Sequence, residues 1–141
     1  MTEIQLATTD VEIKACYPVM QQLRPAYSEV TFLAQIKKQI QAGYHLAYLS
    51  EGRHVWALAG YRYSECLAWG TFLYVDDLIT DSEQRSKGYG KLLLEWLIQQ
   101  AKSHKCAQLH LDSGVQRLDA HRFYEAQGMV KTGYHYAMEL K

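Results

Sequence analysis

The chain has 141 residues, of which 48% are apolar and 21% charged, and its 15 Lys and Arg balance 15 Asp and Glu. A chain of this length and apolar content can bury one hydrophobic core. We therefore expect a single domain over residues 1–141 rather than a disordered protein. The zero net charge argues against a nucleic-acid partner, because binding to a duplex normally draws on an excess of Lys and Arg.

The cysteines and the first residues indicate the compartment. Cys16, Cys66 and Cys106 are odd in number, widely spaced and never form a C-x-x-C pair, which predicts free thiols in a reducing compartment. Residues 1–6 have no basic or apolar signal segment, and the longest apolar run, near residues 56–59, is too short to cross a membrane. We expect a soluble cytoplasmic protein with no membrane partner.

The first half of the chain predicts one strand and two helices, followed by a meander. Residues 3–7 alternate like a strand, and apolar residues recur at helical spacing over residues 11–23, where Pro18 is expected to kink or break the helix. A second helix over residues 28–42 should stop at Gly43.

Three aromatic and aliphatic runs follow without helices between them. They cover residues 44–49, 54–63 and about 71–80, and a polar turn at residues 50–53 joins the first two. This order predicts an antiparallel meander.

The second half predicts helices packed on that sheet. Residues 91–103 form an apolar helical stripe, residues 108–112 a short strand, and residues 119–127 a helix that Asp119 can cap. Residues 129–140 alternate enough for two last strands. The fold class is mixed α+β, with helices on a largely antiparallel sheet.

The most informative segment is residues 84–90, Gln-Arg-Ser-Lys-Gly-Tyr-Gly, between a strand and a long helix. Backbone N–H groups are free at such a helix start, and the helix dipole is positive there. Gly88 and Gly90 allow close approach of a ligand, and Arg85 and Lys87 add positive charge. A pyrophosphate is the natural ligand of this turn.

Two better-known phosphate patterns do not fit the turn. It lacks the Walker glycine spacing, and Leu93 stands where a dinucleotide fingerprint needs its third glycine. Taken alone, the residues leave two interpretations open: a pyrophosphate site, or a plain turn that begins a helix.

Two motifs resemble those of the GNAT superfamily of N-acetyltransferases. Arg85-x-x-Gly88-x-Gly90 resembles its motif A, and residues 120–129 resemble its later A-x-x-F-Y-x-x-x-G-F helix. The expected order of elements also matches over nearly the whole chain. The resemblance implies a GNAT-like fold, with a central, mostly antiparallel twisted sheet of six to seven strands flanked by about four helices.

The resemblance implies direct transfer of an acetyl group from acetyl-CoA to a primary amine of a small molecule or peptide. It assigns the pantetheine arm to the main chain of Leu78, Ile79 and Thr80, and the pyrophosphate to that of Arg85, Ser86, Lys87, Gly88, Tyr89 and Gly90. A homodimer is compatible with the resemblance. A non-catalytic acyl-CoA-binding or regulatory module on this fold, or an interaction protein without a CoA site, remains an alternative.

Tyr124 occupies the tyrosine position of the later motif, and the resemblance implies that it protonates the leaving thiolate. A phenol with a pKa of about 10 is protonated at pH 7 and can donate to a thiolate whose acid has a pKa of about 8.5. The alternative is that Tyr124 is one more core aromatic among eleven tyrosines.

The base that deprotonates the amine is expected to be Asp76 or Asp77, on the strand before the turn. Strand alternation predicts that only one of the two faces the pocket unless the strand bulges, and Asp76 is preferred. Asp112 is a third option, and ordinary exposed carboxylates are the alternative. No metal is expected, since the spacing of His104, Cys106 and His110 matches no common zinc pattern.

The acceptor pocket is the least patterned part of the chain. Aromatic residues near Tyr27, Trp69 and Tyr74 are candidate wall residues, and carboxylates such as Glu29 and Glu65 would suit a cationic amine. Arg117 stands where many family members have an asparagine, so the contact of that amide is in doubt.

Overall fold

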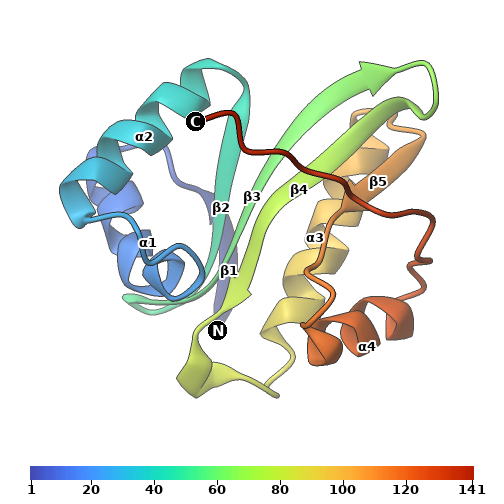
Figure 1. Ribbon diagram of the computed structural model, residues 1–141. Coiled ribbons are helices and arrows are strands. Elements are labelled where there is room, and N and C mark those ends of the chain that lie inside the picture. Colours follow the sequence, from blue (N-terminus) through green and yellow to red (C-terminus); the bar gives the residue numbers. More distant parts are fainter. The chain divides into compact units, whose positions relative to one another are not determined.

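A computed structural model describes residues 1–141, which divide into two compact units, Met1–His110 and Leu111–Lys141. Its sheet has five strands in the order β1-β2-β3-β4-β5 (Figure 1). Their bounds are β1 Thr2–Leu6, β2 Tyr44–Glu51, β3 His54–Cys66, β4 Gly70–Thr80 and β5 Gln108–Leu111. Pairing from β1 to β4 is antiparallel, as the predicted meander requires.

Four α-helices accompany the sheet, with bounds α1 Asp10–Leu23, α2 Glu29–Gln41, α3 Tyr89–Ser103 and α4 Leu118–Ala126. In the first unit, α1 and α2 lie on one face of the sheet and α3 on the other (Figure 1). The α1–α2 face encloses a core that includes Ile13, Phe32, Leu46 and Leu58. The mixed α+β architecture with four helices confirms the predicted fold class. No helix of the structure has the length and apolar character needed to cross a membrane.

Reciprocal capping begins both N-terminal helices. The Thr9 side chain accepts from the Glu12 N–H, while the Glu12 carboxylate accepts from the backbone N–H groups of Thr9 at 3.0 Å and Thr8 at 3.1 Å. Ser28 and Thr31 form the corresponding box on α2. Each box satisfies N–H groups that the first turn leaves free, which fixes where the helix starts.

Helix α1 runs unbroken through Pro18, so of the kink and the break that the sequence analysis expected as alternatives, the break is excluded. Proline removes one hydrogen bond of the helix, but burial on both sides of it compensates. The buried residues of one core flank the proline: Ile13, Cys16, Val19 and Met20. The helix ends at Leu23, two residues before Pro25.

Two C-terminal predictions are wrong. Residues 129–141 form no strand, so the sheet has five strands rather than six or seven. Alternation alone does not make a strand, which also needs a neighbouring backbone for its hydrogen bonds. Arg117, not Asp119, stands at the cap of α4, and Asp119 instead pairs with Arg122 within the first turn.

We expect Glu12→Ala to destabilise the protein more at pH 7 than at pH 3. Hydrogen bonds from Thr9 and Thr8 lower the pKa of Glu12 from 4.5 to about 2. A lowered pKa in the folded state means that the carboxylate stabilises the fold above pH 4.5 and loses this effect as the pH falls toward 2. Thermal unfolding at both pH values measures it, with Glu51→Ala, an exposed carboxylate, as the control. An equal loss at both pH values would contradict the prediction.

Candidate functional site

A pocket of about 280 Å³ opens between the α1–α2 layer and strands β3 and β4. Apolar and amide side chains make up one part of its lining: Met20, Tyr27, Phe32, Gln35, Ile36 and Gln39. The other part is charged and consists of Arg24, Arg62, Asp76 and Asp77. Every lining residue belongs to the first unit.

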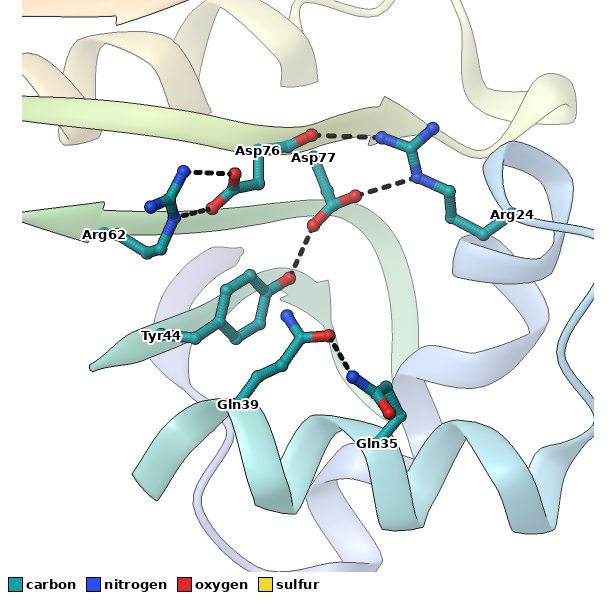
Figure 2. A network of polar contacts seen from close by, with 7 residues as sticks. All are labelled: Arg24, Gln35, Gln39, Tyr44, Arg62, Asp76 and Asp77. Carbon is teal, nitrogen blue, oxygen red and sulfur yellow. Dashed lines mark hydrogen bonds and ion pairs between the residues drawn. The ribbon is translucent and has the colours of Figure 1, made fainter. Parts of the chain in front are cut away.

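Each carboxylate of the pocket is already paired with an arginine (Figure 2). Arg62 grips Asp76 with two hydrogen bonds, from Nε to Oδ2 at 2.7 Å and from Nη2 to Oδ1 at 2.9 Å. Arg24, the cap residue of α1, donates from Nε to Asp77 Oδ1 at 3.0 Å and from Nη2 to the Asp76 carbonyl at 3.1 Å. Figure 2 shows the two arginines at opposite ends of the carboxylate pair.

A β-bulge explains why both aspartates line one pocket. In the β3–β4 register Gly60 pairs with Asp77 and Tyr61 with Val75, so Asp76 is an extra residue without a partner. Such an insertion breaks the alternation of side chains between the two faces. The exception named in the sequence analysis therefore applies: the strand bulges, and both aspartates line the pocket.

The second oxygen of Asp77 is fixed by a buried tyrosine. Tyr44 donates its hydroxyl to Asp77 Oδ2 at 2.8 Å, and burial, followed by the Asp77 charge, raises the pKa of Tyr44 well above its ordinary value. This hydroxyl lies directly against the backbone of Gly60, where a Cβ would come within 1.7 Å of it and 2.7 Å from Asp77 Oδ2. Only glycine leaves room for the hydrogen bond.

The turn after β4 leads into α3 with its N–H groups open. The first helical bond runs from the Leu92 N–H to the Gly88 carbonyl at 3.1 Å, so Tyr89, Gly90 and Lys91 lack intrahelical acceptors. Gly88 stands at the N-cap and offers no side chain to bond them.

The backbone of this turn is in the left-handed region twice, at Ser86 with φ +68° and at Gly88 with φ +83°. The sequence analysis did not predict a left-handed backbone at Ser86. A left-handed serine is uncommon. Lys87 is held over the turn by a hydrogen bond to Gln84 at 2.7 Å.

Residues Leu78, Ile79 and Thr80 pair with β3 along one edge. Beyond the other edge lies β5, whose start is tied to the start of β4 by the hydrogen bond from Ala107 N to Thr71 O at 2.7 Å. A strand of four residues that begins beside Thr71 cannot reach residue 78. The outer main-chain groups of residues 78–80 are therefore not paired with β5.

Tyr124 lies on α4, in the second unit. Burial raises the pKa of its phenol, and the Arg117 charge opposes that shift. The helix ends at Ala126, one residue before the predicted end at residue 127, and Gly128 follows the cap residue with φ +92°. Asp112, the third candidate base, lies in the same unit, with its carboxylate 3.5 Å from His135 Nδ1.

The structure brings together some predicted site residues and leaves others apart. Of the candidate walls, Tyr27 lines the pocket, whereas Trp69 does not and instead stacks on His110. Sequence reasoning missed the partners Arg62 and Tyr44. The one available signal was a charged residue, Arg62, inside an aromatic strand.

Gly60→Ala should destabilise the protein by about 2–4 kcal/mol, because the added methyl displaces the Tyr44 hydroxyl and breaks a buried hydrogen bond to a charged group. Urea unfolding measures the loss. Gly133→Ala is the matched control, since its Cβ would meet nothing within 4 Å and its backbone is not left-handed. Similar stability of the two variants would count against this role for Gly60.

The sequence matches a family model described as the acetyltransferase (GNAT) family over residues 11–129. A relative named "Uncharacterized N-acetyltransferase YhdJ", from Bacillus subtilis (strain 168), is 35% identical over 125 residues, which is 88% of each chain.

Solved structures agree in fold. A transcriptional regulator from Bacillus halodurans C-125 superposes with a TM-score of 0.87 at 21% identity, over 99% of this chain and 100% of that one. The aminoglycoside N-acetyltransferase AAC(6')-Iy, in complex with CoA, superposes with a TM-score of 0.86 at 12% identity, over 99% and 94%. These identities show the fold alone, but the family model and the closer relative together decide the assignment: the chain belongs to the acetyltransferase (GNAT) family.

Proposed function

We propose that the protein transfers an acetyl group from acetyl-CoA directly to a primary amine. The observation that carries the proposal is the turn at residues 85–90, where unbonded N–H groups, two left-handed residues and basic side chains meet at the start of α3. Family membership supports an acyl-CoA donor, since the AAC(6')-Iy relative of the same fold is in complex with CoA.

The donor is proposed to bind through main-chain groups. The N–H groups at the start of α3, together with those of Arg85, Ser86 and Lys87, suit a pyrophosphate because anions are stabilised at helix N-termini. The outer edge of residues 78–80 suits the amides of a pantetheine arm, which would lie along β4 as an added strand.

Tyr124 is the proposed acid that protonates the departing thiolate. Burial raises the pKa of this phenol above its ordinary value of 10, so it is protonated throughout the neutral range. Proton transfer to the sulfur then removes the charge that would otherwise favour the reverse reaction.

Asp76 and Asp77 are proposed to receive the proton of the attacking ammonium, through a water molecule in the pocket. A direct transfer is disfavoured because each carboxylate already accepts hydrogen bonds at both oxygens. The arginines also hold both carboxylates in place, where they can polarise a water molecule between them and the amine.

We expect Gly88→Ala to weaken acetyl-CoA binding at least tenfold while leaving S-acetylpantetheine binding unchanged, because the added Cβ obstructs only the pyrophosphate. Gly52→Ala is the matched control: both glycines are left-handed, at φ +83° and +62°, and neither Cβ would meet an atom within 4 Å. Both variants should therefore lose similar stability, about 1 kcal/mol. Calorimetric titration tests this, and unchanged binding of acetyl-CoA to Gly88→Ala would contradict the assignment of the turn.

Tyr124→Phe should lower kcat by about 10²–10⁴-fold with little change in acetyl-CoA affinity, because it removes the acid and keeps the ring. Since only the protonated phenol donates, the wild-type rate should fall only above the raised pKa of Tyr124. Tyr136→Phe, at an exposed position of the same unit, is the control.

Acetyl-CoA binding by the wild-type protein without turnover on any amine would contradict the proposed transfer and favour a non-catalytic acyl-CoA-binding module.

A further inference from the structure

The pocket beside β4 has no net charge, although four of its ten lining residues are charged. Arg24 and Arg62 contribute two positive charges, Asp76 and Asp77 two negative ones, and no other lining residue is charged. A dicationic amine gains no net electrostatic attraction from a pocket whose positive and negative charges cancel. The carboxylates that suggested a cationic amine from sequence are already neutralised within the protein.

The positive groups are the accessible ones. The side chains of Arg24 and Arg62 are 47% and 48% exposed, whereas those of Asp77 and Asp76 are 14% and 26% exposed. The side chains of the two arginines are therefore more open to a ligand from solvent than those of the two aspartates.

Each arginine has N–H donors that are not used in its contacts with the aspartates. Both use Nε and Nη2 for their contacts with the aspartates, which leaves the Nη1 amino group without a protein acceptor. A guanidinium carries five N–H donors and matches the geometry of a carboxylate or phosphate. The carboxylate partners also hold each fork in a fixed orientation, so little side-chain freedom is lost when an anion binds.

We propose that the acceptor is a small molecule that carries an oxyanion, a carboxylate or a phosphate, in addition to its amine, and that Arg24 and Arg62 select it. The inference rests on the proposed acetyl transfer and names the substrate class of that site. The oxyanion binds the free Nη1 groups, and the amine lies toward the carboxylates. Both charges of a zwitterion are thus matched inside a pocket that is itself neutral.

The rest of the lining supports a small ligand with an apolar portion. The volume of about 280 Å³ is near the lower end for small-molecule sites. Tyr27, Phe32 and Ile36 provide an apolar wall. On α2, Gln35 Nε2 donates to Gln39 Oε1 at 2.9 Å. This leaves the carbonyl oxygen of Gln35 and the amino group of Gln39 for polar atoms of the ligand.

The test compares matched amines that differ only in the oxyanion. The pairs are L-phenylalanine with phenethylamine, L-lysine with 1,5-diaminopentane, and O-phosphoethanolamine with ethanolamine, each assayed with acetyl-CoA by mass spectrometry of the product. We expect the oxyanion-bearing member to have at least tenfold higher kcat/KM. The first two pairs report on a carboxylate and the third on a phosphate. Preference for the member without the oxyanion, or acceptance of none of the six amines, would overturn the inference.

Arginine variants show whether the preference comes from the proposed groups. Arg24→Gln and Arg62→Gln should each reduce the preference, and the double variant should bring the ratio within a pair close to one. The ratio does not depend on how much enzyme is folded, so a structural role alone would not move it. Arg62→Gln with Asp76→Asn removes both charges together, which avoids an unpaired carboxylate, and should also lose the preference.

Arg53→Gln, on the exposed turn between β2 and β3, is the matched control and should keep the full preference. A preference that survives in the Arg24 and Arg62 variants would overturn the inference. Calorimetry with acetyl-CoA separates the two levels of the proposal. No donor binding would contradict the proposed function itself, whereas donor binding with a preferred diamine would contradict only the acceptor class.

Discussion

The extra residue in β4 is the constraint on which the rest of the site depends. Because Asp76 has no partner on β3, both it and Asp77 reach the pocket, and two part-buried carboxylates need hydrogen-bond partners at the same place. Arg62, on the neighbouring strand, forms an ion pair with Asp76, and Arg24, at the end of α1, forms one with Asp77. The bulge thus ties the position of a helix to the shape of a strand.

Local patterns explain most of the fold. Alternation and helical spacing predicted the meander and the positions of α1, α2 and α3, because these elements bury one face each and the pattern records that face. Where tertiary context decides, the patterns misled. Burial on both sides of Pro18 keeps α1 continuous, and the alternating tail over residues 129–140 lacks a strand to pair with.

The candidate site divides in the same way. The turn at residues 84–90 could be proposed from sequence because its glycines and basic residues lie close together at a helix start. The arginine partners were not, since Arg24 lies 53 residues from Asp77 in sequence and only the fold joins them. Gly60 could not be predicted as part of the site from sequence, because the need for glycine there arises only from its contact with the Tyr44 hydroxyl in the folded protein.

This difference has a consequence for specificity. The proposed donor site is built from the main chain of one short segment and would survive wide changes of sequence, since every residue except proline supplies an N–H group. The proposed acceptor pocket is built mostly from side chains of α1, α2, β3 and β4 and would change with each of them. The proteins that superpose on this chain at 12–21% identity therefore share its fold, and that likeness does not fix an acceptor for this chain. In this chain, the proposal assigns that choice to the ion pairs of Arg24 and Arg62, because they set the charge that an acceptor in this pocket would have to match.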